Sequence, residues 1–270
     1  MTPFDVGGVR IGDGRLCVIA GPCLAESTEL CLEVAGALKA LCAELGLGYI
    51  FKASFDKANR TSAASVRGAG LDAGVAALKA VRDSIGVPVT TDIHTADQAS
   101  VVAETVDLLQ IPAFLCRQTD LLEAAARTGR PVNVKKGQFL APHDTKNIVD
   151  KLRGFGAAGI MLTERGTTFG YNALVVDMPG LEIMRSFGVP VCFDATHSAQ
   201  RPGGAGTASG VRESIPAMAR AATAVGIDAL FLEVHPQPEK AASDAATQWP
   251  LARARELLEQ IRAIDQARRR

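Results

Sequence analysis

The sequence predicts an α/β protein with a (β/α)8 TIM barrel, and three observations lead to that prediction. The chain has 270 residues and a mass of 28.3 kDa, the size of one such barrel. Short apolar runs recur roughly every 30 residues, which is the spacing of one βα unit. Helical patterns lie between these runs. A doubly wound open sheet is the alternative, although the GxGxxG fingerprint that commonly follows its first strand is missing.

Eight strands are expected, because the apolar runs are nearly continuous, as in parallel strands that are buried on both faces. The runs are Leu16–Ala20, Tyr49–Phe51, Val87–Thr90, Leu108–Ile111, Val132–Val134, Ile160–Leu162, Val189–Phe193 and Leu230–Val234. The opening segment, Phe4 to Arg15, is expected to form a short hairpin that closes the bottom of the barrel. No linker or low-complexity stretch divides the chain, so residues 1–270 are expected to form a single domain.

Two of the expected helices have clear signals at their starts. Ser27 can cap a helix whose apolar residues continue at helical spacing as far as Leu45. Pro250 is expected to open the last helix, whose apolar face includes Leu257 and Ile261.

The charge balance excludes several classes of partner. Lys and Arg together number 29, as do Asp and Glu, so the formal net charge is zero. A protein that binds nucleic acid or a membrane surface is expected to carry a basic excess, so neither partner is predicted. No apolar run reaches the length of a membrane span, and the polar start is unlike a signal peptide. The six cysteines form no CxxC pair, which favours buried thiols in a reducing cytoplasm.

Reactive side chains follow every expected strand. They are Cys23, Lys52, Lys57, Asp92, His94, Gln110, Lys135, Arg165, Asp194, His197, Glu233 and His235. In a barrel the carboxyl ends of the strands meet at one rim, where the βα loops build the active site. One charged residue in such a place is most simply a solvated loop residue, but eight strand ends that all carry reactive groups predict an enzyme.

The cations of this set predict anionic ligands. Those expected to converge on the rim are Lys52, Lys57, Arg60, Arg117, Lys135 and Arg165. Such a cluster repels itself unless anions fill it, so phosphate or carboxylate groups are the expected ligands. The alternative is pairing with nearby carboxylates such as Asp56 and Glu164, which can account for one or two of the six cations.

A second group combines one thiol, one imidazole and two carboxylates. Cys23, His197, Glu233 and Asp244 can together hold a borderline divalent ion and leave positions open for water or substrate. Spacing alone is weak evidence for this site, because scattered mixed ligands have no fixed signature. The alternatives are a buried Cys23 beside hydrogen-bonded carboxylates, or nucleophilic chemistry of Cys23 with His197.

Motifs from about residue 16 to residue 251 point to one known family. They are GPCLAES, FKASFDKANRTS, TTDIH, LLQIPAFLCRQTDLL, VNVKKGQFLAP, LTERGTTFGYNALVVDMP, CFDATHS and LEVHPQPEKAASDAATQWPL. In order and spacing these motifs closely resemble the 3-deoxy-D-manno-octulosonate 8-phosphate (KDO-8-phosphate) synthases. The resemblance implies a cytoplasmic (β/α)8 barrel, usually a homotetramer. It also implies a transferase of lipopolysaccharide biosynthesis that condenses phosphoenolpyruvate with D-arabinose 5-phosphate and water and releases phosphate.

The resemblance also implies roles for the residues that bind phosphoenolpyruvate. Lys52 and Lys57 are expected to hold its carboxylate. The residues expected around its phosphate and reacting carbon are Gln110, Arg117, Lys135 and Arg165. Asp92 and His94 resemble residues that support these groups or bind a substrate hydroxyl.

The arabinose 5-phosphate site is expected in the loop with Asn59, Arg60 and Thr61. In the family the arginine of this loop reaches the substrate phosphate of a neighbouring subunit, and Ser commonly stands where this chain has Thr61. The residues expected to take part in catalysis are Lys52, Lys57, Asn59, Lys135, Arg165, His197 and Asp244.

The family has a metal-dependent and a metal-independent branch, which differ in having cysteine or asparagine at one position. Cys23, together with the KKGQF, DATHS and SDAAT motifs, resembles the metal-dependent branch. The resemblance therefore implies a divalent ion, one of Mn, Fe, Co, Zn or Cd. The implied ligands are Cys23, His197, Glu233 and Asp244.

Two other functions are considered. A related synthase uses erythrose 4-phosphate in place of the pentose phosphate, but the KANRTS motif favours arabinose 5-phosphate. A non-catalytic barrel that binds sugar phosphates is the other alternative, although every expected catalytic position is filled here.

Overall fold

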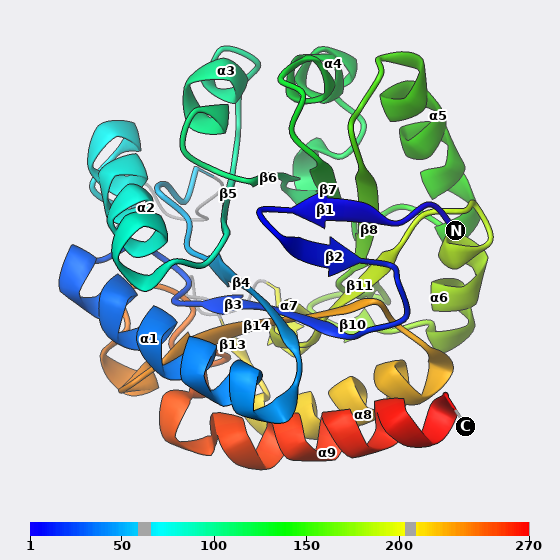
Figure 1. Ribbon diagram of the computed structural model, residues 1–270. Helices are drawn as coiled ribbons and strands as arrows, with labels where there is room; N and C mark the ends of the chain where they lie inside the picture. The colour runs from blue at the N-terminus through cyan, green and yellow to red at the C-terminus, as the bar shows by residue number, and fades with distance from the viewer. Residues whose placement is uncertain (59–65, 203–208, 270) are drawn as a thin grey trace.

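A computed structural model of the chain describes residues 1–58, 66–202 and 209–269. Eight parallel strands close into a barrel where β11 pairs with both β8 and β14, which confirms the predicted fold and rules out the open sheet (Figure 1). The strands are β3 (Cys17–Gly21), β4 (Gly48–Lys52), β5 (Val89–Asp92), β6 (Leu108–Ile111), β7 (Val132–Lys135), β8 (Ile160–Glu164), β11 (Val191–Asp194) and β14 (Ala229–His235). Each overlaps one of the predicted apolar runs.

Helices form the outer ring around this barrel (Figure 1). They are α1 (Thr28–Leu45), α2 (Leu71–Ile85), α3 (Gln98–Ala103), α4 (Thr119–Arg127), α5 (Lys146–Gly154), α6 (Met178–Arg185), α8 (Ile215–Val225) and α9 (Ala254–Arg268). The short α7 (Ala195–Ser198) follows β11 directly, and the 3-10 helices are η1 (Ala113–Leu115), η2 (Pro142–Thr145), η3 (Arg212–Ser214), η4 (Pro238–Lys240) and η5 (Leu251–Arg253). Within the described residues, none of these helices is both long and apolar enough to cross a membrane.

The structure contains both helix starts predicted from sequence. The Ser27 side chain accepts a hydrogen bond from the Leu30 amide at 3.1 Å, which confirms the cap of α1. Pro250 caps η5 (Leu251–Arg253), which runs directly into α9, so the helical segment begins where the sequence predicts, although its α-helical part begins only at Ala254. Pro250 also lies in β15 (Trp249–Pro250), which pairs with the end of β14.

The predicted hairpin closes the amino-terminal end of the barrel. Strands β1 (Phe4–Val6) and β2 (Val9–Ile11) pair antiparallel and lie across that end in Figure 1. Phe4, Val6 and Ile11 are buried and share one apolar cluster with barrel side chains from several strands. Their burial closes this end of the barrel with apolar surface.

Two small sheets in the βα loops are absent from the sequence predictions. One pairs β9 (Thr167–Thr168) with β10 (Leu174–Val175), and the other pairs β12 (Gln200–Arg201) with β13 (Ser209–Gly210). Each has only two residues per strand, too few for a hydrophobic period to be read from sequence. Both lie in loops that follow barrel strands, so they add structure around the rim.

Candidate functional site

The rim at the carboxyl ends of the strands brings together most of the predicted site residues. Lys52, Lys57, Lys135 and Arg165 are each at most 8% exposed, although all four are cations. Buried charges need partners or ligands, because removal from water is costly. The contacts of these four side chains therefore indicate what the site can hold.

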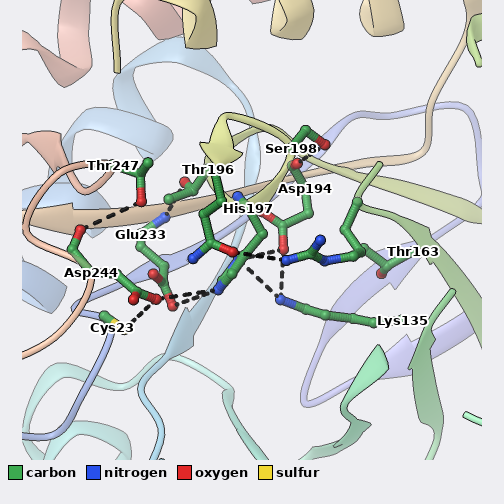
Figure 2. Close-up of polar contacts among 12 residues, drawn as sticks. Cys23, Lys135, Thr163, Asp194, Thr196, His197, Ser198, Glu233, Asp244 and Thr247 are labelled. Carbon is green, nitrogen blue, oxygen red and sulfur yellow. Dashed lines mark hydrogen bonds and ion pairs between the residues drawn. The ribbon is translucent and has the colours of Figure 1, made fainter. Parts of the chain in front are cut away.

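A cluster of metal-binding groups occupies one side of this rim. Ligand atoms of Cys23, Glu233 and Asp244 all lie within 4.8 Å of one another, and all three residues are buried. The Cys23 thiol donates to Asp244 Oδ2 at 3.4 Å. His197 Nε2 lies 3.6 Å from Glu233 Oε1 and 3.7 Å from Asp244 Oδ2, so the imidazole faces the same point (Figure 2). The four residues predicted as metal ligands are thus neighbours, although they come from distant parts of the sequence.

Asp194, at the end of β11, fixes the orientation of the His197 ring. Its Oδ1 accepts the His197 amide at 2.9 Å, and its Oδ2 lies 2.7 Å from His197 Nδ1. With Nδ1 held by this carboxylate, Nε2 is the ring atom that points to Glu233 and Asp244 (Figure 2). This is the arrangement in which a carboxylate orients a metal-binding imidazole.

The loop that carries Asp244 is held in place by Gln248, a fully buried side chain. Gln248 Oε1 accepts the Cys23 amide at 3.1 Å, and its Nε2 donates to the Ser243 carbonyl at 2.8 Å. Asp244 has a φ of 49°, which is uncommon for a residue other than glycine. The amide of Gln248 therefore ties the Cys23 loop to a turn that aims the Asp244 carboxylate at the cluster.

The carboxylates of the site are held in their ionised form by neighbouring cations. Burial alone raises the pKa of Glu233, but the charges of His197, Lys52, Lys57 and Lys135 lower this pKa well below its usual range. The pKa of Asp194 is also lowered, because the effects of His197 and Lys135 outweigh burial. Ionised carboxylates are the form that binds a cation.

The donor set of this cluster fits a divalent metal ion. Glu233 Oε2 is buried and has no hydrogen-bond partner among the described residues. An orphaned carboxylate oxygen beside a thiol, an imidazole and a second carboxylate is satisfied by a bound cation. Mixed sulfur, nitrogen and oxygen donors suit borderline first-row ions. The cluster is therefore a group that can hold such an ion.

Three of the rim cations are paired with carboxylates of the same site. Lys52 Nζ lies 3.1 Å from Glu233 Oε1, and Lys57 Nζ lies 3.6 Å from the same oxygen. Lys135 Nζ lies 2.6 Å from Asp194 Oδ2 and 3.8 Å from the centre of the Phe231 ring. Lys52 and Lys57 thus pair with a carboxylate of the cluster, and Lys135 pairs with the carboxylate that orients His197.

The carboxylates suggested from sequence as alternative partners pair elsewhere. Asp56 forms an ion pair with Arg67, and Glu164 lies 3.5 Å from the buried ammonium of Lys136. Arg165 donates through Nη2 to Gln200 Oε1 at 2.9 Å, while its Nη1 is buried without a hydrogen-bond partner among the described residues. Burial lowers the pKa of Arg165 despite nearby carboxylates. A desolvated guanidinium with a free donor is suited to bind an anion.

Asp92, His94 and Gln110 lie at neighbouring strand ends on the other side of the rim. Gln110 Nε2 donates to Asp92 Oδ1, and Ser54 donates to Asp92 Oδ2 at 2.6 Å. The His94 ring packs edge-on against Phe55 with 5.4 Å between centroids, and its buried Nδ1 has no partner among the described residues. Burial lowers the pKa of His94, so the neutral imidazole is favoured.

The structure does not bring every predicted residue into the cluster. The Arg117 side chain is exposed in the turn between η1 and α4 and forms no hydrogen bond or ion pair with another described residue. Asn59, Arg60 and Thr61 lie outside the described residues. Their predicted roles stay predictions.

Sequence reasoning missed several polar residues that shape the site. They are Ser54, Asn133, Lys136, Thr163, Thr196, Ser243 and Gln248. Thr196, for example, accepts the Glu233 amide at 2.9 Å. Some of them carry a signal that was available, since Asn133 and Thr163 interrupt otherwise apolar strands. A polar residue inside a strand that is buried on both faces needs a partner.

Comparison with known proteins gives a consistent result. The model of the family described as the DAHP synthetase I family matches residues 1–268. The 2-dehydro-3-deoxyphosphooctonate aldolase of Dechloromonas aromatica (strain RCB) is 60% identical over 258 residues, which are 94% of this chain and 93% of that protein. The protein of the same name from Azoarcus sp. (strain BH72) is 56% identical over 267 residues, 97% of this chain and 96% of its own. That of Cyanothece sp. (strain PCC 7425 / ATCC 29141) is 58% identical over 258 residues, 95% and 94% of the two chains.

Proposed function

The chain belongs to the DAHP synthetase I family, and we propose that it joins phosphoenolpyruvate to D-arabinose 5-phosphate. The proposed product is 3-deoxy-D-manno-octulosonate 8-phosphate, and inorganic phosphate is released. The relatives are named for the same compound under the name 2-dehydro-3-deoxyphosphooctonate. The protein is an enzyme of lipopolysaccharide biosynthesis. One observation carries the assignment of this reaction to the rim. Four nearly buried cations converge beside a group of metal-binding side chains, and the guanidinium of Arg165 keeps a buried donor free for an anion.

The charge of the two substrates matches this rim. Phosphoenolpyruvate and arabinose 5-phosphate together carry roughly five negative charges at neutral pH. We assign Arg165 and Lys135 to the phosphate and reacting carbon of phosphoenolpyruvate, and Lys52 and Lys57 to its carboxylate. Three of these cations are held at the rim by Glu233 or Asp194, so they are positioned before substrate arrives. Such preorganisation reduces the cost of binding and orienting two anions.

The reaction forms one carbon–carbon bond and breaks one carbon–oxygen bond. Carbon 3 of phosphoenolpyruvate attacks the aldehyde carbon of the pentose phosphate, and the aldehyde oxygen takes up a proton. Water adds at carbon 2, where positive charge develops, and gives up a proton. The bond between carbon 2 and the phosphate oxygen of the tetrahedral intermediate then breaks, phosphate leaves with the bonding electrons, and the carbon 2 hydroxyl gives up its proton to become the ketone oxygen. We assign the ionised Asp194 and Glu233 to the stabilisation of this developing positive charge, and Arg165 and Lys135 to the departing phosphate.

We assign a divalent ion to Cys23, His197, Glu233 and Asp244. When bound, such an ion would supply a Lewis acid that can polarise a substrate carbonyl. The protein holds these donors in place through two hydrogen bonds. Asp194 contacts Nδ1 of His197, and Gln248 accepts the backbone amide of Cys23. The buried, orphaned Glu233 Oε2 supports this assignment.

Further parts of the proposal concern the assembly. We propose one domain over residues 1–270, a homotetramer in the cytoplasm, and an Arg60 that serves the active site of a neighbouring subunit. All six cysteines are buried and free, which suits a reducing compartment.

The Arg60 proposal is tested by mixing an Arg60→Ala protein with one that carries Arg165→Ala. Recovery of activity in mixed oligomers supports it, and no recovery in oligomers verified as mixed overturns it.

Release of phosphate is the direct test of the reaction. The purified protein is assayed with phosphoenolpyruvate and either arabinose 5-phosphate or erythrose 4-phosphate, with and without a chelator. We expect turnover with arabinose 5-phosphate that the chelator abolishes. Turnover with erythrose 4-phosphate alone contradicts the proposed substrate, and saturable binding without turnover identifies a non-catalytic barrel.

A further inference from the structure

A row of polar side chains crosses four neighbouring strands just below the rim. Asp92 on β5 pairs in register with Gln110 on β6, and Gln110 pairs in register with Asn133 on β7. Thr163 on β8 continues the row. Gln110, Asn133 and Thr163 are at most 1% exposed. Buried polar groups at this depth are costly unless each has a hydrogen-bond partner, so their contacts are informative.

The contacts in this row form an unbroken chain. Gln110 Nε2 donates to Asp92 Oδ1. Asn133 Nδ2 donates to Gln110 Oε1 at 3.1 Å, and the Thr163 hydroxyl donates to Asn133 Oδ1 at 2.7 Å. At the other end, Ser54 donates to Asp92 Oδ2, and Lys57 donates to Ser54 at 3.0 Å. The row thus links a proposed substrate-binding lysine to the interior of the barrel.

One ionised group sets the direction of every bond in the row. Burial raises the pKa of Asp92, but Lys52, Lys57 and Lys135 lower it below its usual range, so this carboxylate is an acceptor only. Gln110 must then turn its NH2 group toward Asp92, which leaves its carbonyl facing Asn133. Asn133 must then donate to this carbonyl through its own NH2 group. The Asn133 carbonyl in turn accepts a hydrogen bond from the Thr163 hydroxyl.

The fixed direction has a consequence at the rim. An amide that is free to flip can present either an acceptor or a donor to a ligand. Gln110 cannot flip, because its oxygen would then face Asp92 and its NH2 group would face that of Asn133. Its carbonyl is occupied by Asn133, and the second hydrogen on Nε2 has no acceptor among the described residues. Gln110 therefore offers a donor, which suits an anionic oxygen.

We infer that Asn133, supported by Thr163, is a positioning residue that holds Gln110 as a hydrogen-bond donor to an anionic oxygen of phosphoenolpyruvate. This inference rests on the proposed function, since it names the ligand of the same site. Neither Asn133 nor Thr163 touches the substrate in this arrangement. Both act through Gln110.

A double-mutant cycle tests this inference with kcat/KM for phosphoenolpyruvate as the readout. Loss of a hydrogen bond to a charged group corresponds to about 10- to 150-fold, which is the loss expected for Gln110→Ala. Asn133→Leu, which removes the donor at similar size, is expected to cause a large part of that loss, mainly through KM for phosphoenolpyruvate. In the Gln110→Ala background, Asn133→Leu is expected to have no further effect. Independent losses that multiply in the double variant overturn the inference, because a general structural role does not depend on Gln110.

Two threonine variants provide a matched comparison. Thr163→Val removes the hydroxyl that orients Asn133 and is expected to raise KM for phosphoenolpyruvate, while Thr163→Ser restores it. Thr90 is equally buried on β5, and its hydroxyl has no hydrogen-bond partner among the described residues. Thr90→Val makes the same chemical change outside the row and is expected to leave KM unchanged. Equal effects of the two valine variants contradict the inference.

Calorimetric titration of phosphoenolpyruvate into each folded variant separates this inference from the proposed function. If the wild-type protein binds no phosphoenolpyruvate, the proposed function fails. If the wild type binds it and Asn133→Leu binds it equally well, the function stands and the positioning role of Asn133 is wrong. Circular dichroism of each variant confirms that the barrel is folded, and Asn133→Ser provides a second variant if the leucine variant does not fold.

Discussion

The two ends of the barrel are built from the same strands but are closed in opposite ways. At the amino-terminal end, Phe4, Val6 and Ile11 fill the opening with apolar side chains. At the carboxyl end, buried lysines, the buried Arg165 and buried carboxylates lie together. Burial of apolar side chains removes them from water and stabilises the fold. Like charges brought together out of water oppose folding unless a ligand or a residue of opposite charge binds them. The amino-terminal end therefore contributes mainly to the stability of the fold, and the carboxyl end is suited to function.

Removal of the metal ion proposed at the rim is expected to have the largest effect. Treatment with a chelator should abolish phosphate release, and adding back a divalent ion should restore it. His197→Ala should lose metal and activity together, because the imidazole is one of the four proposed donors. Cys23→Asn should lose tight metal binding but retain partial turnover that resists the chelator. Elemental analysis accompanies each assay, and a verified metal-free wild type that works at full rate contradicts the metal assignment.

At the opposite end, Phe4→Ala is expected to affect stability without affecting catalysis. The Phe4 side chain is 5% exposed and packs so closely on Gly159 that a Cβ there would lie 2.5 Å from the ring. Removing a buried phenylalanine side chain costs about 3–5 kcal/mol of unfolding free energy. Denaturant unfolding measures this loss, and kcat/KM of the folded fraction should not change. Val101→Ala, at a half-exposed position on α3, is the control with little effect on stability. A fall in kcat/KM for Phe4→Ala would show that the two ends are coupled.

Arg165→Met should produce the reverse pattern at the rim. Loss of a charge-assisted contact of about 1.5–3 kcal/mol predicts a fall of about 10- to 150-fold in kcat/KM. The unfolding free energy should stay the same or rise, because a buried charge whose Nη1 lacks a hydrogen-bond partner among the described residues is replaced by an apolar chain. Added phosphate should raise the melting temperature of the wild type more than that of the variant. Arg255→Met, on the exposed face of α9, is the matched control and should leave kcat/KM unchanged. Normal kinetics for Arg165→Met would remove this residue from the site.

The two ends also differ in how far the sequence predicts them. All eight barrel strands follow from apolar runs, because burial on both faces leaves a continuous pattern. The hairpin has only three residues per strand and β1 is not buried throughout, so the sequence predicts it only as a segment from Phe4 to Arg15. The set of strand-end residues can also be predicted from the sequence, since the barrel topology alone brings strand ends to one rim. Topology brings Cys23 after β3 next to Glu233 in β14, whereas Asp244 reaches within 4.8 Å of both from the loop after η4.

What the sequence does not predict is the support behind these residues. Gln248 and Asn133 lie within family motifs, but the sequence assigns them no role, because their roles depend on atoms brought within about 3 Å by the fold. The sequence also does not predict that the helical segment after Pro250 starts with a 3-10 turn, η5, before α9 begins at Ala254. Hydrogen bonds between distant segments depend on the tertiary structure, which local sequence patterns do not encode.

The smallest expected effect tests whether position at the rim is enough to make a residue functional. Ser27 lies on the rim side, four residues after Cys23, because α1 starts where the loop after β3 ends. It is exposed, and its hydroxyl accepts the Leu30 amide, so its physical role is to cap a helix. Ser27→Ala should lower the unfolding free energy by about 1 kcal/mol, and Ser27→Asp, which keeps the cap, should restore most of it. Neither variant should change kcat/KM or metal content, because no buried charge is altered. If kcat/KM and metal content both fall together with the unfolding free energy in Ser27→Ala, the cap holds the Cys23 loop in place. Function at this end then depends on the start of α1 as well as on the charges.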